Sequence, residues 1–346
     1  MVCFSYHLPM ASHKSHNTHK TISRATSTLG MFVVVVSLLT AIPAPNAHTY
    51  SSSVLHQGRG FTAGTELSRP LGIFFDTTTN ECYVTDTGNH QVIVYDEFGM
   101  PVFRFYHHVN INNKRTLGEP KDLVVDTSGR IFLTDATVPY LDVLDHNGRQ
   151  IVAIDPPYDQ CGENARFDNV ALGTDERVYA IISGTKDRFV AVIGTNLEVY
   201  KILHLTGYAD ENNCLTGIGL DESGRIHVTD PCAELMVQIY DSNGEYLLGF
   251  GRHDSGFENF SHPSSIVVMP NGEMWVVDSI RQVVSCFSAE GKFISYIGGK
   301  GDQLGAFNYP SGVATDGKSR LFVLERAGNR YQCFKIVDND LNTVEE

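Results

Sequence analysis

Residues 70–106 read PLGIFFDTTTNECYVTDTGNHQVIVYDEFGMPVFRFY, a stretch with four apolar runs that each have the length of a β-strand. Residues that favour turns separate the runs, namely Thr79-Asn80, Gly88-Asn89 and Glu97-Phe98-Gly99. Short apolar runs bounded by Gly, Asn and Asp are typical of consecutive antiparallel strands. The stretch therefore predicts one four-stranded antiparallel sheet.

The same pattern recurs along the chain at a nearly constant spacing. The position that ends the first strand falls at residues 76, 126, 173, 221, 269 and 316, in steps of 50, 47, 48, 48 and 47 residues. A repeat of roughly 40 to 50 residues is the length of a four-stranded propeller blade. We therefore expect an all-β, six-bladed β-propeller of four-stranded antiparallel blades. The expected blades lie near residues 70–106, 120–155, 167–205, 215–251, 263–299 and 310–338.

The two ends of the repeat array predict how the ring closes. The last copy, near residues 310–338, has only three strands. The missing strand is found at residues 53–59, because Val54–Gly60 followed by Leu67–Pro70 parallels the end of the fifth copy. We expect this N-terminal strand to pair with the C-terminal blade, which removes exposed sheet edges. Residues 48–346 then form a single propeller domain.

The first 47 residues have a different composition. A basic segment, which contains Lys14, Lys20 and Arg24, precedes the apolar run Leu29–Ile42. Fourteen helical residues span about 21 Å, less than the roughly 30 Å of a bilayer core. This pattern is typical of a signal peptide, with an uncleaved anchor as the alternative. We expect an exported protein, secreted or periplasmic, or attached to a membrane only through residues 29–42.

The charge balance excludes one class of partner. The 346 residues include 26 Lys and Arg against 40 Asp and Glu, a formal net charge of −14. A surface this acidic repels phosphate backbones, so nucleic acid is not an expected partner. A chain of this length buries enough surface to fold without a metal or disulfide, and we expect a monomer.

The segment Tyr83–Asp96 resembles the NHL repeat, whose usual core ends Asn-His-Arg-Val, and Phe307–Asp316 and Gly328–Phe334 are similar. The resemblance extends over residues 54–338 and implies the same six-bladed fold. It does not imply one activity, because propellers host unrelated functions. Two departures stand out: Gln91 replaces the usual Arg, and Ile182 replaces the acidic residue that ends the second strand in the other copies.

The loops that precede the innermost strands should share one face with the loops that join strands two and three. This face is the usual binding surface, and the residues expected at the channel mouth are small or polar. The binding candidates are Arg69, Lys121, Asp122, Asp168, Asn169, Thr216, His262 and Ser264.

Three of these candidates could bind a metal. Asp122, Asp168 and Asn169 offer the hard oxygen donors that Ca²⁺ prefers. The alternative is that the two carboxylates and Lys121 are solvated or paired across the channel. No other cofactor is expected, and His262 alone does not make a zinc site.

Five acidic residues end the second strands and could be mistaken for a catalytic ring. A residue that recurs in most blades meets a need of every blade, so we expect these carboxylates to accept hydrogen bonds from backbone amides of nearby turns. They are Asp86, Asp135, Asp230, Asp278 and Glu325.

Six cysteines follow residue 47, an even number that favours disulfides in an exported chain. Three lie inside expected strands, where cysteine is commonly a small buried hydrophobe. The other three, Cys161, Cys214 and Cys232, fall in loops on one face. Cys214–Cys232 is the expected bridge, and Cys161–Cys214 is the alternative.

From these features we expect a non-catalytic binding scaffold whose loop face holds a protein, peptide or glycan. The alternative is a Ca²⁺- or Zn²⁺-dependent hydrolase or lyase with its site at the central channel. Amidating lyases and lactonase-type propellers are precedents for that alternative. The sequence contains no Gly-x-Ser-x-Gly and no His-Glu-x-x-His motif that would identify a catalytic centre directly.

Overall fold

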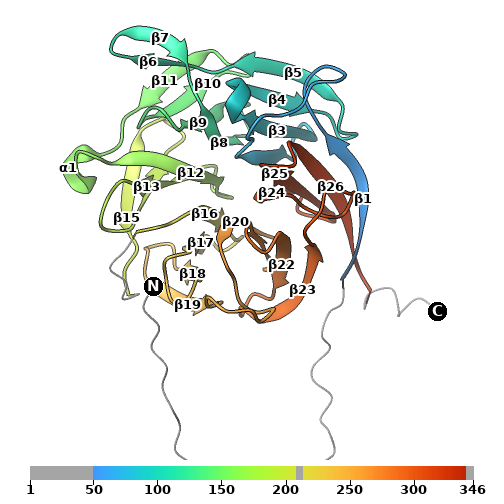
Figure 1. Cartoon of the computed structure of the whole chain (residues 1–346). Coiled ribbons are helices and arrows are strands. Elements are labelled where there is room, and N and C mark those ends of the chain that lie inside the picture. Colours follow the sequence, from blue (N-terminus) through green and yellow to red (C-terminus); the bar gives the residue numbers. More distant parts are fainter. Residues whose placement is uncertain (1–49, 208–212, 340–346) are drawn as a thin grey trace, which may run out of the picture. The chain divides into compact units, whose positions relative to one another are not determined.

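A computed structural model describes residues 50–207 and 213–339, and these residues form six four-stranded antiparallel sheets arranged as a ring (Figure 1). Five blades consist of four strands that are consecutive in sequence. Blade 1 contains β2 (Ile73–Asp76), β3 (Glu81–Asp86), β4 (Gln91–Tyr95) and β5 (Pro101–Tyr106); blade 2 contains β8 (Pro120–Val125), β9 (Ile131–Asp135), β10 (Leu141–Leu144) and β11 (Gln150–Ile154); blade 3 contains β12 (Arg166–Leu172), β13 (Val178–Ser183), β14 (Phe189–Ile193) and β15 (Val199–His204).

Blades 4 to 6 complete the ring. Blade 4 contains β16 (Gly217–Leu220), β17 (Ile226–Thr229), β18 (Val237–Tyr240) and β19 (Tyr246–Phe250); blade 5 contains β20 (Pro263–Val268), β21 (Met274–Asp278), β22 (Val283–Phe287) and β23 (Phe293–Gly298); blade 6 contains β24 (Pro310–Thr315), β25 (Arg320–Glu325), β26 (Arg330–Asp338) and β1 (Tyr50–Gly58). The innermost strands contact one another in the order β2, β8, β12, β16, β20, β24 and back to β2. The ring is therefore closed around a central channel.

The two ends of the ring are joined by strand pairing, as the sequence predicted. β1 runs antiparallel to β26 from the pair Tyr50–Asp338 to the pair Gly58–Tyr331. The Tyr50 hydroxyl also donates to Glu273 of blade 5 at 2.7 Å. The first strand therefore completes blade 6 and ties its outer end to the neighbouring blade.

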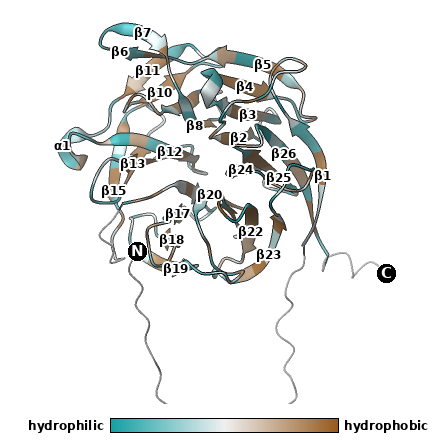
Figure 2. Ribbon diagram, viewed as in Figure 1, coloured by the Kyte–Doolittle hydropathy of each residue, from teal (hydrophilic) through white to brown (hydrophobic). Residues whose placement is uncertain are grey.

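The hydrophobic core consists of six layers, one between each pair of neighbouring blades. Each buried apolar cluster contains residues from two adjacent blades, such as Trp275 of blade 5 with Phe334 of blade 6. Because both faces of every sheet are covered, the central strands read as continuous apolar runs instead of alternating ones. Figure 2 shows this as hydrophobic colour along β22, in contrast to the hydrophilic α1 (Tyr158–Cys161) and β7 (Lys114–Leu117).

The hairpin that follows blade 1 was not predicted from the sequence. Blade 1 is followed by a two-stranded hairpin of β6 (His108–Ile111) and β7. The turn residues Asn112 and Asn113 both have positive φ, at 52° and 59°, as a type I′ turn requires. The Asn-Asn pair was the available signal, but the polar strands on either side lack the alternating pattern that identifies a strand.

The expected signal peptide or anchor at residues 1–47 lies outside the described residues. Among the residues that are described, no helix has the length and apolar character needed to cross a membrane.

A buried polar network lies where the chain passes from blade 1 to the hairpin. His107 is 2.9 Å from Asp135 through Nδ1 and 2.9 Å from Asp142 through Nε2, and all three side chains are about 1% exposed. Burial lowers the pKa of His107, but the hydrogen bonds and charges of the two carboxylates outweigh burial and raise its pKa above the ordinary value. The network joins blades 1 and 2 through an ion triad.

Replacing His107 with Gln should destabilise the protein by about 3 kcal/mol at pH 6, because two buried carboxylates lose their cation. A histidine whose pKa is raised by folding stabilises fully below its unfolded pKa of 6.5, and that contribution disappears as pH rises through the folded pKa. Urea unfolding at pH 6 and pH 9 should therefore show a smaller difference at pH 9. His108→Gln, an exposed neighbour, is the control; equal stability of wild type and His107→Gln at pH 6 would refute the role.

Candidate functional site

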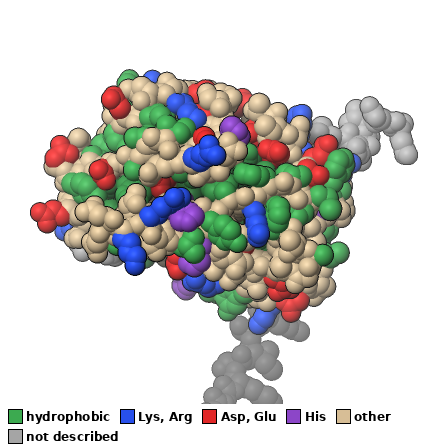
Figure 3. Space-filling model, turned by 90° about the horizontal axis from the view of Figure 1, so that it is seen from above, with side chains coloured by type: hydrophobic (Ala, Val, Ile, Leu, Met, Phe, Trp, Pro, Cys, Tyr) green, Lys and Arg blue, Asp and Glu red, His purple; other side chains and the backbone are tan. Residues whose placement is uncertain are grey.

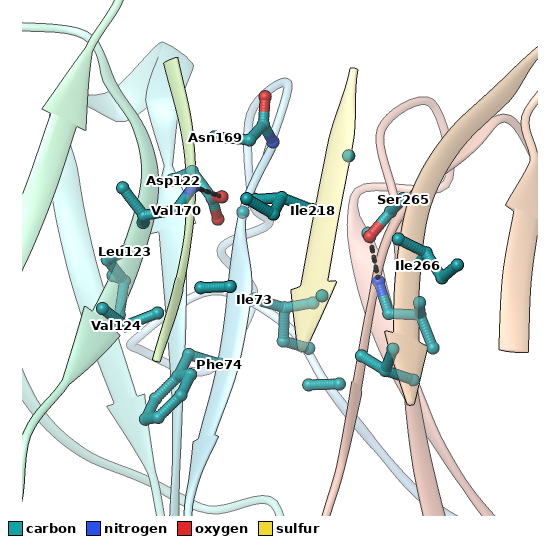
Figure 4. A pocket seen from close by; sticks show the side chains of 18 of the residues that line it. Ile73, Phe74, Asp122, Leu123, Val124, Asn169, Val170, Ile218, Ser265 and Ile266 are labelled. Atoms are coloured by element: carbon teal, nitrogen blue, oxygen red, sulfur yellow. Dashed lines mark hydrogen bonds between the residues drawn. The ribbon is translucent and has the colours of Figure 1, made fainter. Parts of the chain in front are cut away.

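The central channel has a polar end and an apolar end (Figure 4). A cavity of about 210 Å³ lies between the innermost strands. Phe74 and Val124 line it toward one end, while Asp122, Asn169 and Ser265 lie toward the other. The polar end is therefore where a ligand could meet charged or hydrogen-bonding groups inside the ring.

Register shifts in the innermost strands orient these polar side chains. The innermost strands of blades 2, 3, 5 and 6 each have a register shift at this end, such as the one between Pro120 and Asp122. A bulge of this kind redirects the side chains next to it. At the same position, blades 1, 4 and 6 carry Gly72, Gly217 and Gly312, so no side chain closes the channel there.

A second cavity, of about 650 Å³, lies at the channel mouth and shares Leu71, Asn169 and Ser311 with the channel. Its walls come from the loops that precede the innermost strands and from the loops that join strands two and three. Six of the eight predicted binding residues line it: Lys121, Asp168, Asn169, Thr216, His262 and Ser264.

The other two predicted residues lie elsewhere. Asp122 lines the channel beneath the mouth. Arg69 lines neither of these two cavities; its exposed guanidinium is 3.6 Å from Glu119. An exposed pair at this distance contributes little, so Arg69 is not brought into the candidate site.

Asp122 occupies the most unusual environment in the channel. One carboxylate oxygen accepts the backbone N–H of Val170 in blade 3 at 3.0 Å. The other lies against Gly72, where an added Cβ would come within 2.6 Å of it, so only glycine fits there. Burial is the main cause that raises the pKa of Asp122 to about 7, and the Asp168 charge adds to it; backbone N–H groups and Lys121 oppose the shift. Asp122 can therefore exchange a proton near neutral pH.

Lys121 and Asp168 form an ion pair across the boundary between blades 2 and 3. The Lys121 side chain is 31% exposed and Asp168 is 14% exposed, so the pair sits in the wall of the mouth and remains accessible from it. Asp168 thereby fixes the position of the Lys121 ammonium. The site therefore contains an ammonium group in a fixed position, that of Lys121, next in sequence to the titratable carboxyl group of Asp122.

The neutral candidates have different environments. The Thr216 hydroxyl donates to the carbonyl of Pro263 at 2.9 Å, which joins blades 4 and 5. The Ser264 hydroxyl is buried without a hydrogen-bond partner among the described residues, so its polar group is available to a ligand. His262 is exposed at the rim of the mouth.

Blades 5 and 6 contribute more to this cavity than the two predicted residues His262 and Ser264. Ser279, Tyr309, Ser311 and Arg326 also line the mouth. Arg326 is exposed and adds a second cation to the wall. Tyr309 occupies the repeat position before an innermost strand, so repeat position alone could have identified it.

As they are arranged, the predicted metal ligands do not fit a divalent cation. Asp168 is already paired with Lys121, and one oxygen of Asp122 accepts the Val170 N–H. Within residues 50–207 and 213–339, the one group of three His, Cys, Asp or Glu side chains with clustered donor atoms is Cys214, Asp230 and Cys232. Two of these are joined in a disulfide, so that group is not a metal site either.

The five recurring acids have the structural role that the sequence suggested. Asp278, for example, accepts the backbone N–H groups of Ser261 and Ile280 on the two loops that flank it. The others bond equivalent loops: Asp86 accepts from Ser68, Asp135 from Thr137, Asp230 from Cys232 and Glu325 from Asn308. These carboxylates fix the loops that form the mouth and do not themselves line it.

A disulfide joins Cys214 and Cys232 in the wall of the mouth. The alternative bridge from Cys161 is wrong, because Cys161 is a buried free cysteine that packs in the core between blades 2 and 3. The observed bridge connects the loop before β16 to the loop after β17, and Thr216 follows Cys214 by two residues. It therefore restrains one side of the candidate site.

Removing this bridge should lower the free energy of unfolding by about 3 kcal/mol, because it closes a loop of 18 residues. The measurement is thermal unfolding of Cys214→Ala/Cys232→Ala beside wild type. Dithiothreitol should lower the melting temperature of wild type and leave the double variant unchanged. If the variant melted with wild type, the bridge would not stabilise this face.

Comparisons with known proteins place this geometry among six-bladed propellers. No protein-family model and no curated protein matches the sequence. Among solved structures, a gluconolactonase from Xanthomonas campestris is 12% identical with a TM-score of 0.58, over 83% of this chain and 89% of that one. A virginiamycin B lyase from Staphylococcus aureus is 10% identical with a TM-score of 0.56, over 84% and 100%. A luciferin-regenerating enzyme is 11% identical with a TM-score of 0.59, over 84% and 96%.

These likenesses establish the six-bladed propeller fold and do not specifically establish the NHL repeat family. They also correct the functional expectation. The similar structures that carry an activity in their names are enzymes, so the prediction of a non-catalytic scaffold is wrong, and the hydrolase or lyase alternative is favoured. The sequence misled because a propeller enzyme scatters its functional residues singly over several blades, without a local motif.

Proposed function

We propose that this protein is a hydrolase or lyase that opens a cyclic ester at the mouth of the propeller channel. The observation that carries the proposal is the convergence of a fixed ammonium, Lys121, and a carboxyl group that titrates near neutral pH, Asp122, where the channel meets a cavity of about 650 Å³. The gluconolactonase among the similar structures supports the substrate class, because a lactone is a cyclic ester.

Opening an ester requires a group that stabilises negative charge on the carbonyl oxygen and a group that moves a proton. A partly buried cation that is already in position suits the first task, because no reorganisation is needed when the charge develops. A carboxyl group with a pKa near the working pH suits the second. Lys121 and Asp122 have these properties, and Asp168 acts as the positioning residue for Lys121.

The two reaction types differ in which proton Asp122 takes. In hydrolysis the Asp122 carboxylate takes a proton from the attacking water, the acyl C–O bond breaks, and the same carboxyl group returns the proton to the departing alkoxide. In elimination it takes a proton from the carbon next to the alkoxy carbon, and the bond between that alkoxy carbon and the ester oxygen breaks as the double bond forms, so that the ester group departs as a carboxylate. Lys121 stabilises the oxyanion in the first case and the enolate or carboxylate in the second.

The cavity walls suit a hydroxylated substrate. The unpartnered Ser264 hydroxyl, Thr216 and Tyr309 line the mouth, and Arg326 can pair with an anionic substituent. The apolar channel floor beneath Asp122 limits water near the reacting groups.

The Lys121 ammonium also argues against a bound Ca²⁺ at this site. Asp122, Asp168 and Asn169 provide oxygen donors of the kind Ca²⁺ takes, but the Lys121 ammonium supplies a positive charge at the same place. We propose that the cation of this site is Lys121. Turnover should then be unchanged in EDTA, and stoichiometric Ca²⁺ binding by calorimetry would contradict this part of the proposal.

The experiment is a screen of γ- and δ-lactones, sugar lactones and cyclic depsipeptides with the wild type and Lys121→Met. We expect turnover of at least one cyclic ester and a loss of about 10²- to 10³-fold in kcat for Lys121→Met, the size of effect from removing one oxyanion donor. Lys186→Met, an exposed lysine in blade 3, is the matched control. Turnover that is equal in wild type and Lys121→Met would place the chemistry elsewhere.

Two further features belong to the proposal. The segment Tyr83–Asp96 supports an NHL-type repeat as the ancestor of these blades. The Cys214–Cys232 disulfide supports export through residues 29–42, because such bridges persist in oxidising compartments. Mass spectrometry of the N-terminus after expression in the exporting host tests whether the first 47 residues are removed.

A further inference from the structure

Exposed apolar side chains are concentrated in one stretch of the chain, which runs along the outer edge of blade 1 and through the hairpin that follows it. Seven of the 17 large hydrophobic side chains that are exposed among the described residues lie within residues 97–117, which we name the blade 1 rim. They are Phe98, Met100, Val102, Phe103, Tyr106, Ile111 and Leu117. Phe98 is 71% exposed and Met100 is 63% exposed, so most of each side chain is in contact with solvent. Large exposed apolar patches on a protein surface mark interaction sites.

The rim combines a sheet edge with the additional hairpin. β5 is the outermost strand of blade 1, and β6 and β7 extend the chain beyond it. Both faces of β5 are exposed, Val102 and Tyr106 on one and Phe103 on the other, while Phe105 packs inward against Gly148 of blade 2. The strand therefore presents apolar side chains to solvent on both of its faces.

The rim is basic in an acidic protein. Residues 97–117 contain three cations, Arg104, Lys114 and Arg115, and one acid, Glu97, so their net charge is +2, whereas that of the whole chain is −14. Two further acids, Asp96 and Glu119, lie just outside this stretch. No ion pair within the described residues engages Lys114 or Arg115. Figure 3 views the molecule from the side on which β5, β6 and β7 lie in Figure 1. It shows Lys, Arg and His side chains among hydrophobic ones, with Asp and Glu side chains also present on this face.

We propose that the blade 1 rim docks the protein onto an anionic lipid surface. Apolar side chains that enter the headgroup layer and cations that meet lipid phosphates or carboxylates are the two contributions that hold a peripheral protein on a membrane. An outermost strand with apolar side chains on both faces suits the headgroup layer, because lipids can contact both faces. A second copy of this chain is disfavoured, because a symmetric antiparallel pairing of β5 edges would bring like charges at Arg104 close together.

Co-sedimentation of the full chain with vesicles tests the proposal. The wild type should bind vesicles of phosphatidylcholine with about 30% phosphatidylserine at least tenfold more tightly than vesicles of pure phosphatidylcholine, and about 0.5 M salt should weaken that binding. Lys114→Glu/Arg115→Glu should weaken it about thirtyfold or more, on the basis of about fivefold for each cation near the surface. Phe98→Ser/Met100→Ser should weaken it about tenfold or more.

Matched controls carry the same kinds of change away from the rim. Leu247→Ser/Leu304→Ser alters two exposed apolar side chains, one in blade 4 and one in the loop before blade 6, and Lys186→Glu/Lys335→Glu alters two exposed lysines. Both controls should bind as wild type does, and all variants should keep the wild-type melting temperature. The proposal is overturned if the wild type ignores anionic vesicles, if the control pairs weaken binding as much as the rim pairs, or if light scattering finds a dimer that Phe98→Ser/Met100→Ser disperses.

Discussion

Replacing Asp122 with Asn should make the protein more stable and catalytically inactive at the same time. The inactivation follows from the proposed function, because the amide cannot carry the proton, and general acid–base catalysis contributes about 10²- to 10⁴-fold. The stabilisation follows from the environment of the carboxyl group. Burial raises the pKa of Asp122 from 3.8 to about 7, so the folded protein holds the charged form at a cost.

The sign of the stability effect depends on pH. Between about pH 4 and pH 7 the folded state binds a proton on Asp122 that the unfolded state has lost, so stability falls as pH rises through this window and stays reduced above it. A neutral amide side chain in place of the carboxylate would accept the Val170 N–H without this cost. We expect Asp122→Asn to be more stable than wild type by about 2 kcal/mol at pH 8, and nearly equal at pH 4.

Urea unfolding at pH 4 and pH 8 is the measurement. The matched control is Ser265→Ala, which removes the corresponding inter-blade acceptor in blade 5, where Ser265 receives the Val313 N–H at 3.3 Å. That control should be slightly less stable than wild type at both pH values, because an acceptor is lost. If Asp122→Asn were destabilised as well, Asp122 would be a structural acceptor and would not be a strained functional group.

Removing β1 should have the largest effect on stability of any short deletion. β1 pairs with β26 along its whole length, and its residues Tyr50 and Val54 pack against the core between blades 5 and 6 that contains Phe334. Without it, an edge of blade 6 and the neighbouring aromatic core become exposed to water. We expect residues 61–346 to lose roughly 5 kcal/mol or more relative to residues 48–346, enough to prevent folding at about 37 °C.

A point substitution in β1 and the addition of β1 as a separate peptide test whether the loss of stability comes from the open ring. Gly58→Val should also destabilise, because an added Cβ would lie 1.9 Å from the Tyr331 ring. A synthetic peptide of residues 48–60 should restore the circular dichroism and melting transition of residues 61–346. A scrambled peptide of the same composition should not. A truncated chain that folded with unchanged stability would show that the ring does not depend on β1.

The fold could be predicted from sequence because it depends on repetition. Each copy carries the same strand lengths and turn residues, so errors in one copy, such as the missing acid at Ile182, are corrected by the others. Ring closure was predictable for the same reason, since the unmatched strand at one end fits the unmatched blade at the other. The β6–β7 hairpin was missed because it occurs once and has no partner copy to compare.

The candidate site was predictable only in part. Repeat position placed six of the eight named residues at the mouth, because loops at equivalent positions meet on one face. It could not show that Lys121 pairs with Asp168, or that the carboxyl of Asp122 is buried against Gly72, since both depend on contacts between blades. Those contacts change a set of apparent metal ligands into an ammonium and a titratable acid.

The pH dependence of kcat/KM for the best cyclic ester found in the screen decides whether Asp122 carries the proton. With Asp122 as the proton acceptor, kcat/KM should rise about tenfold per pH unit below pH 6 and become level above pH 8, with an apparent pKa near 7. The residual activity of Asp122→Asn should lack this rise. A profile for wild type that is flat from pH 5 to pH 9, or one whose rise persists unchanged in Asp122→Asn, would contradict the assignment of the channel mouth as the active site.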